Sequence, residues 1–120
     1  MRMKLSRQTT IRIRRRLTAK DSEGGTVITW GKPQEAIAEV WPASDQLQAQ
    51  TYGDKIHSIM NVKIAGNYTI RHEGNHLIFV FPLFELGEGD GVCVYSDDAP
   101  DYQIVSATPY RPLKLEVKRI

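Results

Sequence analysis

The carboxy-terminal end of the chain alternates between apolar and charged residues, and this pattern constrains the fold more than any other feature. Leu113, Leu115 and Val117 are each followed by a charged residue. Successive side chains of a β-strand point to opposite faces, so a period of two predicts a strand with one buried face. Similar short runs recur along the chain without the long helices of a parallel α/β protein. The sequence therefore predicts an all-β fold: a small antiparallel β-barrel of about six to eight strands, or a sandwich.

Turn residues divide the rest of the chain into further strand-like runs. The length of 120 residues is that of one domain, so we expect a single barrel domain over residues 1–120. The strands from residue 91 onward are expected to form a meander, and so are those of the first third. The further predicted strands cover residues 9–17, 26–30, 36–41, 59–64, 68–71, 77–81, 91–96 and 102–107.

The first of these strands contains a charge on its apolar face. Residues 9–17 place Ile11, Ile13 and Leu17 on one face, and Arg15 falls on the same side. An unpaired buried charge is costly, so either a bulge turns Arg15 outward or its side chain contacts an internal carboxylate.

The opposite face of this strand is basic. Arg12, Arg14 and Arg16 project from it at a spacing of about 6.6 Å, which is close to the phosphate repeat of a nucleic-acid strand. We interpret this basic face either as a DNA-contacting surface or as an exposed face that forms salt bridges with its neighbours.

Charge is segregated along the chain although the net charge is only +2. Basic residues dominate the segment before Asp21, including residues 1–8, which we expect to form a flexible basic arm. Residues 72–110 contain no Lys or Arg. The two ends could pair within one molecule or attract the next copy. The candidate acidic residues for such a subunit contact are Glu85, Glu88, Asp90, Asp97 and Asp98.

Between the two groups of strands lies a polar, glutamine-rich segment. Residues 43–55 place Asp45 and Gln48 at the spacing of a capping box. This segment is predicted to be a long loop or one short helix.

One motif matches a catalytic pattern. Residues 72–76 fit the His-Glu-x-x-His sequence of zinc metalloproteases, which requires both imidazoles on one face of a helix. Here Gly74 and Asn75 are poor helix formers, and strand-like runs flank the motif. We therefore predict a hairpin turn, with zinc hydrolysis as an alternative.

Other features favour binding over catalysis. The acidic run 97–101 lacks the ligand spacing of a calcium loop and predicts a solvated turn, while Cys93 lies among strand residues and is expected to be buried. No phosphate-binding glycine loop or nucleophile elbow occurs. We expect no enzyme activity, no metal and no cofactor, and neither a secretion signal nor a transmembrane span.

The order of the motifs along the chain follows a broader pattern. It begins with the basic strand 11–17, the turn 21–25 and Trp30. Val-Trp-Pro at 40–42 then leads into the polar segment 44–53. The chain closes with Gly-Asp-Gly-Val-Cys-Val-Tyr at 89–95, Asp-Tyr-Gln-Ile-Val at 101–105 and Leu-Lys-Leu-Glu at 113–116. Over residues 10–120 this order resembles the phage head-tail joining (head-closure) family, although the segment between residues 53 and 88 is longer than the family pattern.

The resemblance implies a small β-barrel that acts as a structural virion protein in the neck of a tailed phage, made in the cytoplasm of the bacterial host. Its expected partners are the portal and adaptor ring, the tail-completion proteins and further copies of itself in a twelve-fold ring. In the family a long loop meets double-stranded DNA in the central channel without sequence specificity. The residues that resemble this loop are Ser44, Gln46, Gln48, Gln50 and Lys55. A stand-alone barrel that binds nucleic acid is the main alternative.

Overall fold

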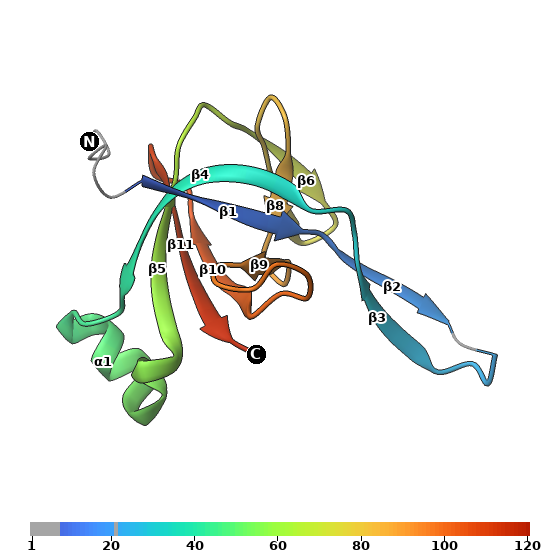
Figure 1. Ribbon diagram of the computed structural model, residues 1–120, viewed down its shortest axis with the longest axis horizontal. Coiled ribbons are helices and arrows are strands. Elements are labelled where there is room, and N and C mark those ends of the chain that lie inside the picture. Colours follow the sequence, from blue (N-terminus) through green and yellow to red (C-terminus); the bar gives the residue numbers. More distant parts are fainter. Residues whose placement is uncertain (1–7, 21) are drawn as a thin grey trace.

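A closed antiparallel barrel of six strands forms the centre of the computed structural model, which describes residues 8–20 and 22–120 (Figure 1). The strand order around the barrel is β1-β4-β5-β11-β10-β9. The predicted small all-β barrel is thereby confirmed, whereas the predicted arm at residues 1–8 lies almost wholly outside the described residues. The barrel strands are β1 (Gln8–Arg14), β4 (Gln34–Pro42), β5 (Ile59–Ile64), β9 (Gly91–Cys93), β10 (Tyr102–Thr108) and β11 (Leu113–Arg119).

The interior of the barrel is filled by the alternate residues of its strands. The period-two pattern of β11 is confirmed, because Leu113, Leu115 and Val117 are fully buried. Full burial of such a side chain stabilises the fold by about 1.5–3 kcal/mol. The other strands contribute Ile11, Ile13, Ala36, Ala38, Val62, Ile64, Val92, Tyr102 and Ile104.

A second sheet closes over the barrel core. It contains β6 (Thr69–Glu73), β7 (His76–Val80) and β8 (Glu85–Gly87), in that order. Phe79 and Leu86, together with Phe81 after β7, belong to the same buried cluster as the barrel residues. Strand β8 falls outside the strands predicted from the sequence.

A third sheet extends outward from the barrel. Strands β2 (Arg16–Lys20) and β3 (Thr26–Trp30) pair only with each other, while β1 pairs with β4. The predicted meander of the first third is therefore wrong: these four strands form one long hairpin that bends after β1 and projects from the barrel (Figure 1). Leu17, predicted to be buried, lies on the projecting part and is 50% exposed. The meander of β9, β10 and β11 is confirmed.

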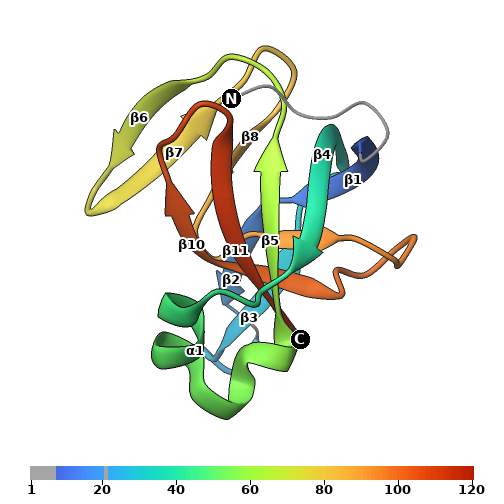
Figure 2. The ribbon, with the colours of Figure 1, turned by 90° about the vertical axis from the view of Figure 1, so that its left-hand side faces the viewer.

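The polar segment forms two short helices. Helix α1 (Gln46–Tyr52) is followed by the 3-10 helix η2 (Gly53–Ser58), which leads directly into β5. Figure 2 places this helical segment at the end of the molecule opposite the β6–β7 hairpin. Of the two predictions for residues 43–55, the short helix is confirmed.

Candidate functional site: the projecting hairpin and its junction with the barrel

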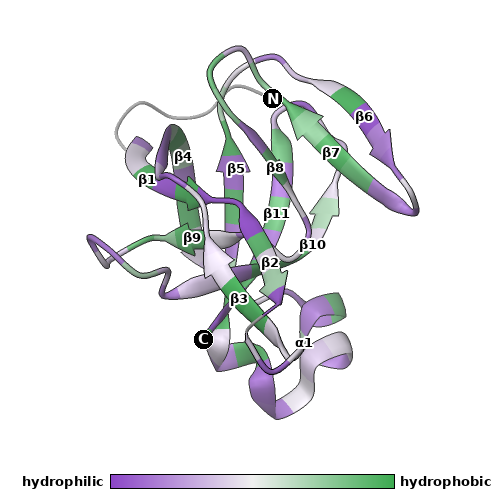
Figure 3. Ribbon diagram, turned by 90° about the vertical axis from the view of Figure 1, so that its right-hand side faces the viewer, coloured by the Kyte–Doolittle hydropathy of each residue, from purple (hydrophilic) through white to green (hydrophobic). Residues whose placement is uncertain are grey.

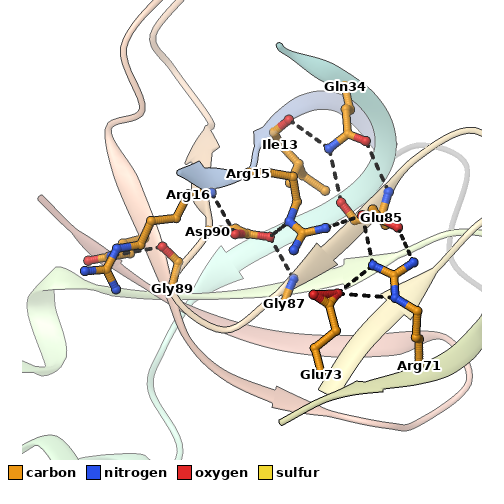
Figure 4. Close-up of polar contacts among 11 residues, drawn as sticks. Ile13, Arg15, Arg16, Gln34, Arg71, Glu73, Glu85, Gly87, Gly89 and Asp90 are labelled. Carbon is orange, nitrogen blue, oxygen red and sulfur yellow. Dashed lines mark hydrogen bonds and ion pairs between the residues drawn. The ribbon is translucent and has the colours of Figure 1, made fainter. Parts of the chain in front are cut away.

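The long hairpin bends where Arg15 interrupts the strand between β1 and β2. The carbonyl of Arg15 accepts a hydrogen bond from the amide of Gly31 at 2.8 Å, so the two arms of the hairpin stay paired across the bend. The Arg15 guanidinium points to two carboxylates, with Nη1 donating to Glu85 and Nε lying 2.8 Å from Asp90 Oδ2 (Figure 4). Nε makes no aligned hydrogen bond among the described residues, so its contact with Asp90 is ionic. Of the two predicted outcomes for Arg15, the internal carboxylate is confirmed.

Asp90 is the buried centre of this junction. It is 4% exposed, and its carboxylate accepts the amide of Arg16 at 2.9 Å and the amide of Gly87 at 2.8 Å. Burial raises the pKa of Asp90 above its usual value, although the two amides and Arg15 act in the opposite direction. The prediction that Asp90 contacts a neighbouring subunit is wrong, because its carboxylate satisfies backbone donors inside the chain.

Glu85 joins the second sheet to the same junction. One of its oxygens accepts from Arg71 Nη1 at 2.9 Å and the other contacts Arg15. The hydrogen bond from Arg71, with the charge of Arg15, lowers the pKa of Glu85. The Gln34 side chain also bonds both backbone groups of Glu85, accepting at 3.2 Å and donating at 3.1 Å. Glu85 thus ties β8 to β4 and to the bend.

Arg14 closes the junction from the other side. Its Nε donates to Gly31 O at 2.6 Å, and its two Nη atoms donate to Trp30 O at 3.2 Å and Asp98 O at 2.9 Å. Arg14 therefore ties the root of the hairpin, at Trp30 and Gly31, to the turn after β9 at Asp98 instead of presenting a free cation.

The predicted continuous basic face does not exist, because the strand breaks at Arg15. Arg12 lies on β1 and forms an ion pair of 3.8 Å with Asp97, whereas Arg16 lies beyond the bend on β2. Asp98 forms a similar pair of 3.6 Å with Arg14. Of the two possibilities for the segregated charge, pairing within one molecule is therefore observed at these positions.

The acidic segment after β9 is a turn, as predicted. The side chains of Asp97 and Asp98 are fully exposed. Asp101 accepts the amides of Val94 at 2.8 Å and Tyr95 at 2.9 Å. Because these donors are satisfied by a carboxylate, β9 ends at Cys93 and not at residue 96 as predicted. Cys93 itself is buried, as expected, and Glu88 is exposed.

Beyond its first pair, Arg16 and Trp30, which lie near Gly89 and Gly91, the hairpin of β2 and β3 is exposed on both faces in the described part of the chain. All of β2 and most of β3 are exposed. Three of the exposed side chains are apolar: Leu17 is 50% exposed, Val27 41% and Ile28 47%. Figure 3 shows hydrophobic positions in both strands. A lone two-stranded hairpin is marginally stable in water. We therefore take this hairpin as the candidate interaction site.

Sequence reasoning did not identify the hairpin as a surface. A signal was present, because Val27 and Ile28 are consecutive in a strand and must point to opposite faces. At most one of them can enter a single core.

The helical segment is anchored to the barrel by polar contacts. Asp45 caps α1 by accepting the amide of Gln48 at 2.7 Å, as their spacing predicted. The Gln48 side chain is buried and donates to Asn61 and, at 2.7 Å, to Glu116. The Tyr52 hydroxyl donates to Glu116 at 3.0 Å, and burial together with this carboxylate raises the Tyr52 pKa to about 12.

These contacts correct one predicted channel residue. Gln48 faces the barrel wall and is not available to DNA, because the helical turn after Asp45 directs its amide inward. The other four candidates, Ser44, Gln46, Gln50 and Lys55, are exposed.

The zinc-protease pattern is a hairpin turn, as predicted. Gly74 and Asn75 connect β6 to β7, and Gly74 has a φ of +61°. Glu73 pairs with His76, so His72 and His76 project from opposite faces of the hairpin. The pair of zinc ligands needed by a metalloprotease is therefore not formed. No group of three potential metal ligands gathers anywhere in residues 8–20 and 22–120.

No family model, curated protein or solved structure matches this chain. Within the described part, no helix is both long and apolar enough to cross a membrane.

Proposed function

We propose that this chain is a structural subunit of a phage neck, which joins the DNA-filled head to the tail and helps to close the DNA channel. The motif order that resembles the head-tail joining family supports this role, and a small barrel is the fold that the resemblance implies. The observation that carries the proposal is the projecting hairpin of β2 and β3, which exposes apolar side chains on both faces.

The construction of the hairpin favours assembly over ligand binding. Its root is fixed by Arg14, Arg15 and Asp90, while Leu17, Val27 and Ile28 beyond the bend are exposed. An exposed apolar surface held out on a rigid support is typical of a protein–protein contact. Copies of this chain, the portal or adaptor ring and the tail-completion proteins are the proposed partners.

The helical segment is proposed to face the DNA channel. Its exposed side chains include Ser44, Gln46 and Gln50, which are polar but uncharged, and the single cation Lys55. Such a surface would contact double-stranded DNA without the strong phosphate binding that a cluster of cations produces. Gln48 would then serve to anchor this surface to the barrel wall.

The test uses DNA-filled, tailless capsids that lack this protein. Purified protein should restore DNA retention and tail joining, whereas the double substitution Leu17→Asp and Val27→Asp should abolish both without changing the circular dichroism spectrum. Asn75→Asp, at an exposed turn of another hairpin, is the matched control and should behave as the unchanged protein. Capsids that retain DNA and accept tails without this protein would contradict the proposal.

A second experiment tests the channel surface. Replacing Gln46 and Gln50 by Lys adds cations where DNA is proposed to pass, so DNA ejection from completed particles should slow. Replacing Asn67 and Asn75 by Lys, at two exposed amides away from the helical segment, should leave ejection unchanged. Equal ejection rates in both variants would contradict the proposal that the helical segment faces the DNA channel.

A further inference from the structure

We propose that strand β3 pairs edge to edge with β3 of a second copy of this chain, antiparallel and around a two-fold axis. The two hairpins then form one four-stranded sheet in the order β2-β3-β3-β2. This inference goes beyond the proposed function, because it concerns free subunits and does not depend on a role in a phage neck. The backbone of β3 carries the contact.

The outer edge of β3 has backbone groups without a partner. The amide of Gly31 donates to the carbonyl of Arg15, so the backbone groups of these two residues face each other. Pairs that face each other in this way alternate with pairs that do not in an antiparallel ladder, and β2 and β3 continue the same register. The backbone groups of Thr26 and Ile28 therefore point away from β2. Neither residue has another hydrogen-bond partner within residues 8–20 and 22–120.

Two contacts at the root of the hairpin support this assignment. The Trp30 carbonyl accepts from the side chain of Arg14 at 3.2 Å, and the Arg16 amide donates to Asp90 at 2.9 Å. Trp30 and Arg16 lie opposite each other, and their groups bond outside the hairpin because they point away from it. The outward groups are thus occupied at the root and open further along β3.

Strand β3 also lacks the residues that protect an open edge. Its sequence is Thr-Val-Ile-Thr-Trp, in which every residue is β-branched or aromatic and favours a strand. Natural edge strands are commonly protected from strand addition by Lys, Pro or a bulge. Strand β2 carries Arg16 and Lys20, whereas β3 carries no charge, and the ladder between them has no register shift. The hairpin therefore has one protected edge and one edge that can accept a further strand.

The free backbone groups define the register of the pairing. A two-fold axis at Val27 places Thr26 of each copy opposite Ile28 of the other, and each of these pairs exchanges two hydrogen bonds. The Trp30 carbonyl, which Arg14 already occupies, is not needed. The cross-strand neighbours are then β-branched residues without charge, a favourable combination in a sheet. A second β3 therefore satisfies the free groups of the first.

The pairing changes the hairpin from two strands to four. A lone two-stranded hairpin is marginally stable in water, and additional strands stabilise it. Leu17 and Val27 lie on the same face of the hairpin, and the two-fold axis joins this face in both copies into one continuous apolar surface.

Further growth of the sheet is disfavoured. Both outer edges of the four-stranded sheet are β2 strands. Antiparallel pairing of two β2 strands around Thr18 would place Arg16 opposite Lys20, and like charges in this position are destabilising. The two-fold contact is therefore closed and stops at a pair of subunits.

Cross-linking tests the contact directly. The Cα atoms of the two Val27 residues would lie about 4.5 Å apart, as in other pairs without mutual hydrogen bonds, which is within the range of a disulfide. Purified Val27→Cys protein should therefore form disulfide-linked dimers on mild oxidation. Leu17→Cys, on the same face but on the protected edge, is the matched control and should stay monomeric. The native Cys93 is buried and stays in place. Absence of Val27→Cys dimers, or equal yields in the control, would overturn the proposal.

Proline substitution tests the role of the backbone. Ile28→Pro removes an amide that points to the open edge and leaves the bonds to β2 in place, a position that sheets tolerate. The unchanged protein should dimerise in sedimentation experiments as its concentration rises, whereas Ile28→Pro should stay monomeric. Thr18→Pro, directly opposite on β2, is the control and should dimerise as the unchanged protein does. Dimers of a folded Ile28→Pro variant would overturn the proposal.

A charge exchange covers the case in which Ile28→Pro does not fold. Val27→Lys and Val27→Glu should each be monomeric, because like charges would meet at the two-fold axis. Mixing the two variants should restore dimers that contain one copy of each. Failure of the mixture to dimerise would also overturn the proposal.

The outcomes separate this inference from the proposed function. Val27→Cys dimers of a protein that does not complete capsids would support the pairing and contradict the neck role. Capsid completion by a protein that forms no such dimers would support the neck role and overturn the pairing.

Discussion

Strands β1 and β4 in the barrel and strands β2 and β3 beyond the bend belong to one continuous hairpin, yet the two parts bury their side chains differently. In the barrel, Ile11 and Ile13 are fully buried, whereas Leu17, just past the bend, is 50% exposed. Both parts are paired along their length. The comparison shows that strand pairing alone does not bury a surface, because burial requires a second layer to pack against.

The largest difference is expected between a barrel leucine and a hairpin leucine. Leu115→Ala should lower the free energy of unfolding by about 2–5 kcal/mol, because it leaves a cavity in the core. Leu17→Ala should change it by less than about 0.5 kcal/mol, because solvent already reaches this side chain. Urea unfolding measures both values, and similar losses would show that the hairpin is covered in solution.

A smaller effect is expected at the junction between the two parts. Asp90→Ala should cost about 2 kcal/mol, because the amides of Arg16 and Gly87 lose their acceptor. Glu88→Ala, an exposed neighbour, is the control and should be neutral within about 0.5 kcal/mol. Faster amide hydrogen exchange at Arg16 in the first variant would show that the hairpin has loosened at its root. Unchanged exchange there would mean that Asp90 does not hold the bend.

Two arginines on the outer face of β1 sharpen the comparison further. Arg14→Ala should cost about 1 kcal/mol, because the carbonyls of Trp30 and Gly31 at the hairpin root and that of Asp98 in the acidic turn lose a donor. Arg12→Ala should cost less than about 0.5 kcal/mol, since its ion pair with Asp97 is exposed and long. Thermal unfolding at low and high salt measures the stability of both variants. Equal losses of stability in the two variants would contradict the role of Arg14 at the junction.

The smallest effect is a difference in pH dependence between the two junction carboxylates. The raised pKa of Asp90 contributes stability at low pH, which is lost as pH rises through its folded pKa. The lowered pKa of Glu85 contributes stability above its unfolded value, which is lost as pH falls. On acidification from about pH 7 to about pH 3, Asp90→Asn should therefore lose more stability than the unchanged protein, and Glu85→Gln should lose less. Urea unfolding across this range checks the order, and parallel curves would contradict it.

The barrel could be predicted because its strands carry a local signal. The alternation of β11 by itself indicates which of its residues are buried. The inner face of this strand was therefore predicted correctly without knowledge of the strands that pair with it. The same rule failed at Leu17, because its burial depends on whether a second layer lies above the hairpin. Whether such a layer is present depends on the tertiary structure and cannot be read from the alternation of the strand.

The polar junction shows why the site was harder to predict than the fold. The misplaced charge of Arg15 indicated an internal carboxylate, but the one it contacts in β8, Glu85, is 70 positions away. Gln48 gives a second example. Its spacing from Asp45 predicted the cap, whereas its burial depends on Asn61 and Glu116, which only the folded barrel brings near.

The continuity of the hairpin with the barrel wall has a mechanical consequence. A load applied at the tip of β2 and β3 is carried by covalent backbone into β1 and β4, so the hairpin acts as a lever. Sliding of β1 along β4 by one residue would turn Ile11 and Ile13 to the solvent, which resists any shift in register. The bend between Arg15 and Gly31 lies on this path, and it is braced by a backbone hydrogen bond between the two strands and by the side chains of Arg14, Arg15 and Asp90. A force on the hairpin would therefore pass through the braced bend into the barrel wall.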